Sequence, residues 1–188
     1  MNTESDLQRK ISRWMEEAYD AEDDKACMEL AGKVLSVSPD NPEALLLAAE
    51  VFEGGEEEYR TRIRHALEVL KKPSPEWSGL LSEGCRPDWL KIAALQRLAF
   101  SLLCGEESGE DELEEALALS GELSALDTEG DSLGRLLHYG ALLRLKRYRE
   151  ALRETMRDGA DSPERAYTKA LAAFRLSGAC DESYRAVC

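Results

Sequence analysis

The chain has 188 residues, of which 33% are charged and 43% hydrophobic, and its formal net charge is −14 at pH 7. This length fits one domain with a sizeable core, so we expect a single domain over residues 1–188. The acidity excludes nucleic acid, whose phosphates need a basic surface, and anionic membrane surfaces. It favours either solubility alone or a basic protein partner.

The first residues lack the basic start and apolar core of a secretory signal, and the longest apolar runs, such as 44–49, are too short to span a bilayer. We therefore expect a cytoplasmic protein. Five cysteines form no C-x-x-C pair, and the two histidines, His65 and His138, have no second histidine four residues away. We expect free thiols, structural histidines, no metal and no cofactor.

Helix-forming residues dominate and no segment alternates with period two, so the predicted fold is all-α. The clearest boundary is the turn around Pro39, where Asn41 is placed to cap the next helix and Pro42 suits its first turn. Helices are predicted near residues 5–20, 23–37, 42–53, 56–71, 88–104, 110–126, 131–145, 147–158 and 163–177, with a short further helix over 181–187.

One spacing of large and small apolar residues recurs along these helices. It begins with Ile11, Trp14, Met15 and Ala18 and returns 34 residues later. Such a spacing places the four side chains on one helical stripe. The later instances are Leu45, Ala48, Ala49 and Phe52; Leu95, Leu98, Ala99 and Leu102; Leu136, Tyr139, Gly140 and Leu143; and Tyr167, Ala170, Leu171 and Phe174.

This pattern resembles the first helix of a tetratricopeptide repeat (TPR). The family also places a small residue in the second helix with a proline twelve residues later, a pairing that Ala151 and Pro163 match, and Cys27 and Pro39 match in spacing. The resemblance implies a right-handed superhelix, an α-solenoid, of about five antiparallel helix pairs. The approximate repeats are 8–41, 42–72, 88–127, 131–163 and 164–188, with an irregular insertion at 73–87 holding one or two helical turns around 77–81. A generic helical bundle is the alternative.

In the family, the first helices of successive pairs line a concave groove that binds a protein or peptide. The resemblance implies a groove that is acidic at its N-terminal end, apolar in its middle and basic at its C-terminal end. A bound peptide would then carry basic residues toward the N-terminal repeats. The predicted groove residues are Glu16, Tyr19, Glu50, Glu53, Gln96, Phe100, Leu103, Leu137, Arg144, Arg165 and Arg175. If the register slips by one residue, Phe100, Leu103 and Leu137 belong to the core instead.

The predicted function is therefore a protein–protein interaction scaffold or adaptor that catalyses nothing. TPR domains that clamp a C-terminal carboxylate use Lys and Asn at set groove positions, where this chain has Ser12, Glu16 and Leu47. That clamp is absent. A dedicated chaperone of a bacterial secretion system is one alternative, on size and charge, and an enzyme of unrecognised type is another.

Two further expectations concern tryptophans and the C-terminal end. Trp77 and Trp89 are either packing anchors or an exposed binding feature, and packing is favoured. The chain ends without a polar capping helix, so either more chain follows or this end pairs with another copy or a partner. Of these we favour a two-fold homodimer.

Overall fold

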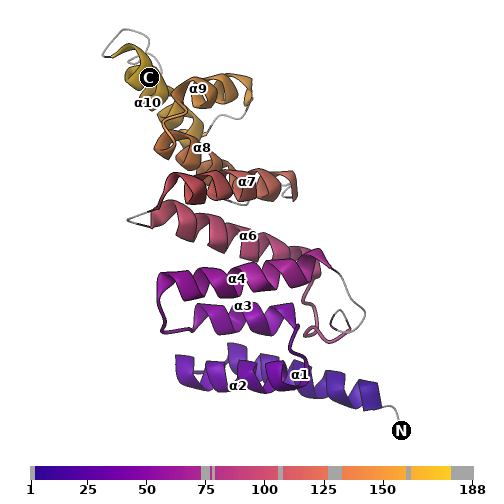
Figure 1. Cartoon of the computed structure of the whole chain (residues 1–188). Coiled ribbons are helices and arrows are strands. Elements are labelled where there is room, and N and C mark those ends of the chain that lie inside the picture. Colours follow the sequence, from indigo (N-terminus) through magenta and orange to yellow (C-terminus); the bar gives the residue numbers. More distant parts are fainter. Residues whose placement is uncertain are drawn as a thin grey trace. The chain divides into compact units, whose positions relative to one another are not determined.

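The structure is a computed structural model, and it describes residues 3–72, 77, 79–105, 108–126, 133–159 and 162–178. These residues form α-helices joined by turns, without a strand, as predicted (Figure 1). The helices are α1 (Thr3–Tyr19), α2 (Asp24–Val37), α3 (Pro42–Glu50), α4 (Glu56–Lys71), α6 (Pro87–Cys104), α7 (Glu110–Leu126), α8 (Gly134–Arg144), α9 (Tyr148–Arg157) and α10 (Pro163–Ser177).

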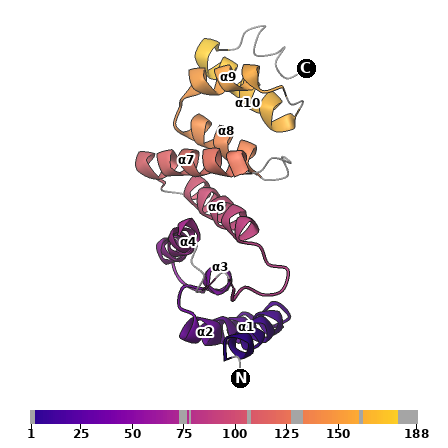
Figure 2. The same ribbon diagram turned by 90° about the vertical axis from the view of Figure 1, so that its right-hand side faces the viewer.

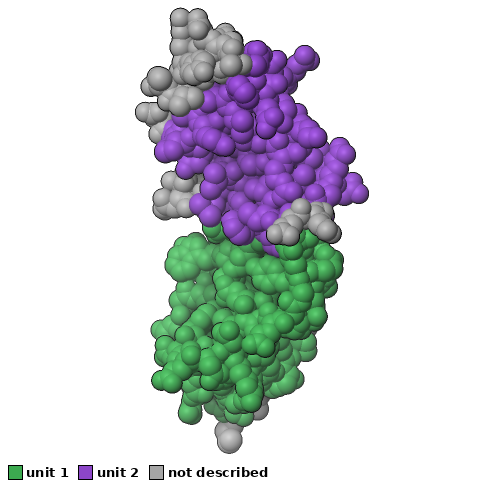
Figure 3. Space-filling view, turned by 90° about the vertical axis from the view of Figure 1, so that its left-hand side faces the viewer, with its two compact units in different colours: residues 1–98 green, residues 99–188 purple. Residues whose placement is uncertain are grey.

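Backbone contacts group the chain into two compact units, Met1–Leu98 and Ala99–Cys188 (Figure 3). Helix α6 contributes residues to both units. No helix among the described ranges has the length and apolar character needed to cross a membrane.

Capping side chains set where several helices begin. Asn41 accepts a hydrogen bond from the N–H of Ala44 at 3.0 Å, and Pro42 follows it in the first turn of α3. The N–H of Ala26 donates to Asp23 at 2.7 Å at the start of α2. Each cap satisfies an N–H that the helix itself leaves unpaired. The predicted role of Asn41 is confirmed.

Unit 1 has a core between α1, α2 and α3, which pack in chain order, followed by α4 on α3 (Figure 1). The first template instance supplies its α1 side, since Ile11, Met15 and Ala18 are 0–3% exposed. The other buried members of this cluster are Cys27, Ala31, Val34, Ala44, Leu47 and Ala48. Truncating a large core residue such as Ile11 to Ala costs about 2–5 kcal/mol in proteins generally.

In unit 2, α7 packs on α8, and α8 packs on both α9 and α10, while α9 and α10 lie side by side (Figure 2). Its core cluster consists of Tyr139, Leu142, Ala151 and Ala172. Ala151 was the predicted small residue of a second helix, and it is fully buried.

The repeat template predicts burial well in α6 and poorly after it. Its α6 members, Leu95, Leu98, Ala99 and Leu102, are at most 1% exposed. In α8 and α10 the template is only partly right: Tyr139 and Ala170 are buried, but Leu136 is 46% exposed and Tyr167 is 67% exposed. The buried residues next to these exposed positions are Leu137, Ala141 and Leu142 in α8 and Ala172 and Ala173 in α10.

Two other predictions need correction. Helix α3 ends at Glu50 rather than near 53, because the N–H of Phe52 bonds to the carbonyl of Ala49 and tightens the last turn. Trp89 is 58% exposed, with the guanidinium of Arg86 over its ring at 5.1 Å, so packing was the wrong choice there. It was right for Trp77, which is 3% exposed. The predicted helix over 181–187 lies outside the described residues, and pairing through that end stays a prediction.

Candidate functional site

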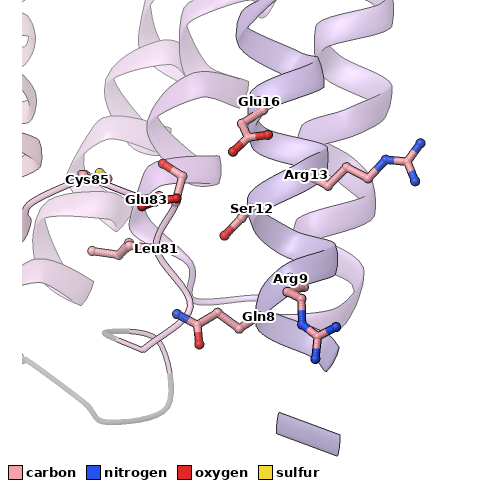
Figure 4. A pocket seen from close by; sticks show the side chains of 10 residues that line it. Gln8, Arg9, Ser12, Arg13, Glu16, Leu81, Glu83 and Cys85 are labelled. Atoms are coloured by element: carbon pink, nitrogen blue, oxygen red, sulfur yellow. The ribbon is translucent and has the colours of Figure 1, made fainter. Parts of the chain in front are cut away.

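A cleft of about 570 Å³ lies in unit 1 between α1 and the loop 79–86 (Figure 4). Residues of α1 form one wall and residues of the predicted insertion form the other. The lining residues are Gln8, Arg9, Ser12, Arg13, Glu16, Leu81, Ser82, Glu83, Gly84 and Cys85.

The α1 wall follows from helical spacing. Gln8, Ser12 and Glu16 are four residues apart, so they occupy one face of the helix. Figure 4 shows Ser12 and Glu16 extending toward the loop that carries Glu83 and Cys85. The opposite, apolar face of α1 is fixed in the core, so this polar face must point outward.

The loop wall is held to the helices by buried contacts. The side-chain amide of Asn41 donates to the carbonyl of Leu80 at 3.0 Å, and Leu81 is 7% exposed. Trp77 is buried, and its carbonyl accepts from the N–H of Leu80 at 2.8 Å in a single helical turn. Gly84 has a φ of 84°, a conformation that favours glycine and lets the loop turn back. The insertion is thus an ordered wall at these residues.

The carboxylate of Glu43 holds this loop through hydrogen bonds to Ser82. Glu43 is 1% exposed at the start of α3, and it accepts a hydrogen bond from the N–H of Ser82 at 2.8 Å and another from the Ser82 hydroxyl. The hydroxyl of Tyr19 donates to it at 3.1 Å. The N-terminal end of α3 also favours a negative charge at this position. Glu43 therefore connects α1, α3 and the loop.

This buried carboxylate raises the pKa of two acidic groups beside it. Burial, together with the charge of Glu43 and a hydrogen bond to it, raises the pKa of the Cys85 thiol from 9.0 to about 12. Burial and Glu43 likewise raise the pKa of Tyr19 well above its ordinary value. Both groups therefore stay protonated at neutral pH, and the Cys85 thiol is a poor nucleophile there.

Of the predicted groove residues in unit 1, Glu16 lines the cleft and Tyr19 lies beside it through Glu43. Glu50 forms an ion pair with Arg97 of α6, which neutralises its charge. Glu53 is exposed after the end of α3, and Gln96 is half-buried in α6; neither lines the cleft.

The predicted groove residues of unit 2 differ in how much of them is accessible. Phe100 is 53% exposed, whereas Leu137 is 3% exposed and packs inside the unit, so the core alternative holds for Leu137. Leu103 is half-buried, against Gly140. Ala141 and Leu142 are fully buried and so mark the inner face of α8. Leu137 is four residues before Ala141, so it lies on that same inner face.

The three predicted basic groove residues also differ. Arg144 donates to the carbonyls of Leu103 and Gly105, and Arg165 donates to the carbonyl of Thr155 at 2.6 Å. Arg175 is exposed on α10. Arg144 and Arg165 thus hold parts of unit 2 together, and their binding of an acidic partner stays a prediction.

A serine, a histidine and a carboxylate meet in unit 2, in an order known from hydrolases. Ser120 Oγ lies 3.2 Å from His138 Nδ1, and His138 Nε2 lies 2.8 Å from Glu154 Oε2. A nucleophile must reach its substrate, but Ser120 is 0% exposed and its hydroxyl donates to the carbonyl of Leu117 at 2.8 Å. The arrangement therefore connects α7, α8 and α9 as a structural bridge. Among the described residues, no group of three or more His, Cys, Asp or Glu side chains is placed to hold a metal ion.

The loop wall was the part of the site that sequence reasoning missed. Ser82, Glu83 and Gly84 lie in the segment 73–87, which was predicted only as an irregular insertion. Only Gly84 carried a local signal, since an isolated glycine between polar residues marks a tight turn. Comparisons with known proteins add no relative: no family model, no curated protein and no solved structure matches the chain.

Proposed function

We propose that the protein is a TPR-like scaffold that binds an extended segment of another protein in the cleft between α1 and the loop 79–86. The proposed architecture is a right-handed superhelix of about five antiparallel helix pairs. The packing of α8 on both α9 and α10 supports it, because the first helix of a TPR contacts its own partner and the next first helix. The proposed role is binding, without a chemical step.

The observation that carries the proposal is a cleft whose two walls are already ordered. The loop is fixed by Glu43, Asn41 and buried Leu81, so binding need not pay for ordering it. The walls of the cleft offer polar side chains of α1 and the backbone of the turn at Gly84, and both suit an extended chain.

The cysteines support a cytoplasmic location for this scaffold. Cys27, Cys85 and Cys104 are free thiols in the described part of the chain. Free thiols persist in a reducing compartment, so we propose the cytoplasm.

A peptide selection tests the proposal. Random peptides displayed on phage are selected against the full chain, and the affinities of retained peptides are measured by fluorescence anisotropy. Ser12→Trp places a large ring in the cleft, whereas Ser36→Trp makes the same change on the exposed surface of α2, away from it. Circular dichroism checks that both variants are folded.

We expect retained peptides to bind wild type and Ser36→Trp alike and to lose binding to Ser12→Trp. Peptides that bind Ser12→Trp as tightly as wild type would contradict the proposal. A selection that retains no binding peptide would contradict it as well.

A further inference from the structure

We propose that this cleft recognises a cationic side chain, a lysine or arginine of the bound segment, between Glu16 of α1 and Glu83 of the loop. This inference rests on the proposed function and specifies its partner as a basic segment. It follows from the balance of charges around the cleft, not from the number of acidic residues in the chain.

The two arginines that line the cleft are neutralised by carboxylates of α1 itself. Arg9 pairs with Asp6 at 3.1 Å, and Arg13 pairs with Glu17 at 2.8 Å. Figure 4 shows the guanidinium of Arg13 pointing away from the loop. These cations are therefore poorly placed to attract an acidic ligand into the cleft.

The acidic side chains of the cleft have no such compensation. Neither Glu16 nor Glu83 has a hydrogen-bond or ion-pair partner for its carboxylate among the described residues. Glu16 belongs to the α1 wall and Glu83 to the loop wall. In Figure 4 the side chain of Glu16 extends from α1 toward the loop that carries Glu83. A cationic group that enters the cleft would therefore lie between two carboxylates.

Glu43 does not line the cleft, but it bonds to Ser82 of the loop wall and adds a third negative charge. Among the described residues its hydrogen-bond donors are the N–H and hydroxyl of Ser82, the hydroxyl of Tyr19 and the thiol of Cys85, none of which is positively charged. The carboxylate is satisfied by hydrogen bonds, but no cation in the described part of the chain pairs with its charge. Low-dielectric walls focus the field of such a charge toward the opening. The field in the cleft therefore favours a positive group.

The shape of the cleft fits the other part of a basic side chain. Leu81, which is 7% exposed, lines the cleft beside Ser82 and gives it a small apolar surface. Lys and Arg bury their methylene stems on apolar surface while their charged ends stay in polar surroundings. The cleft therefore offers a place for both parts of the side chain.

Matched peptides test the inference. One cleft-dependent peptide from the selection is synthesised with Lys, Arg, norleucine or Glu at each position in turn, and affinities are measured for the full chain. The variants Glu16→Gln and Glu83→Gln remove one carboxylate each. Glu29→Gln, on the exposed surface of α2, changes the net charge equally outside the cleft.

At one peptide position we expect Lys or Arg to bind more tightly than norleucine, and Glu to bind most weakly. Glu16→Gln and Glu83→Gln should each reduce the affinity ratio of the cationic to the norleucine peptide by roughly two- to fivefold, the range for partly exposed ion pairs. The double variant should remove the preference, and Glu29→Gln should leave it intact. Raising the salt concentration from about 0.05 to about 0.5 M should shrink it, because salt screens exposed charges.

Cleft-dependent binding in which no position prefers a cation would overturn this inference and leave the proposed function standing. So would a preference that Glu16→Gln and Glu83→Gln leave unchanged. Peptide binding that ignores Ser12→Trp would instead overturn the proposed function, and the cationic subsite with it.

Discussion

The N–H of Ser82 donates to Glu43 Oε2 at 2.8 Å, and this bond joins a loop of the insertion to the first turn of α3, 39 residues earlier. The Ser82 hydroxyl bonds to the other carboxylate oxygen. One buried acidic side chain thus sets the position of the wall that faces α1. The shape of the cleft depends on this connection.

Removing the Glu43 carboxylate should loosen this wall. Glu43→Ala leaves the N–H of Ser82 and the hydroxyl of Tyr19 without their acceptor, which costs about 1–3 kcal/mol for a buried polar group. Glu43→Gln keeps one acceptor oxygen and should cost less. Hydrogen exchange of the Ser82 amide and urea unfolding measure both effects. Equal protection of Ser82 in Glu43→Ala and wild type would show that the loop is held by other contacts.

Cys85 should make the protein less stable at alkaline pH. Its thiol pKa is about 12 in the folded protein against an ordinary value of 9.0, so between these values the unfolded chain has released a proton that the folded chain retains. The folded state then binds more protons, and the free energy of unfolding falls as pH rises through this window, having been unaffected below it.

Cys85→Ser removes this titration. Urea unfolding from about pH 8 to about pH 11 should show a smaller alkaline loss of stability in Cys85→Ser than in wild type. All other titrating groups are common to the two proteins, so the difference between the two curves is the relevant quantity. Parallel curves would contradict the assigned environment of the thiol.

The contact between Gly140 of α8 and Leu103 of α6 predicts a graded response to side-chain size. A Cβ at Gly140 would lie 2.8 Å from Leu103 Cδ2, the mobile end of a half-buried side chain. In Gly140→Ala the gain in helix propensity, about 1 kcal/mol, offsets the adjustment of Leu103. Gly140→Leu should cost about 1–3 kcal/mol because it overpacks the contact. Thermal unfolding checks both, and a stabilising Gly140→Leu would contradict the packing.

Lys146 ends α8 in the left-handed conformation, with a φ of 58°. The N–H of Arg147 bonds to the carbonyl of Leu142, and that of Lys146 bonds to the carbonyl of Leu143, which together form a Schellman cap. Lys146→Gly should therefore stabilise unit 2 by about 0.5–1 kcal/mol, since glycine adopts this conformation without steric cost. Lys33 lies on the exposed face of α2, within the helix, and Lys33→Gly should lower the stability of the protein by a similar amount. A destabilising Lys146→Gly would contradict the cap.

The helices were predictable because their signals are local. Asn41 and Pro42 mark the start of α3 from the sequence alone, and the predicted bounds of α4, α7 and α10 agree with the structure. Helical period identified the inner face of α6. It was only partly right in α8 and α10, where Tyr139 and Ala170 are buried but Leu136, Tyr167 and Phe174 are exposed. The spacing alone does not decide which of the neighbouring apolar positions meets the adjacent helix, since Leu137 and Leu142 are buried in α8 instead of Leu136.

The site was predictable only on its α1 side. Glu16 follows from helical spacing, whereas Glu83 depends on where the loop returns. That return is set by Glu43 and Asn41, which contact residues 39 positions away. No local pattern encodes such a contact. The charge of Glu50 was also misjudged, because its pairing with Arg97 depends on the packing of α6.

Hydrogen–deuterium exchange of the full chain, with and without its tightest selected peptide, tests the central claim most directly. Binding in the cleft predicts added protection over residues 8–16 and 79–86, with little change over α9 and α10. Protection confined to α7–α10, with residues 8–16 and 79–86 unchanged, would contradict it.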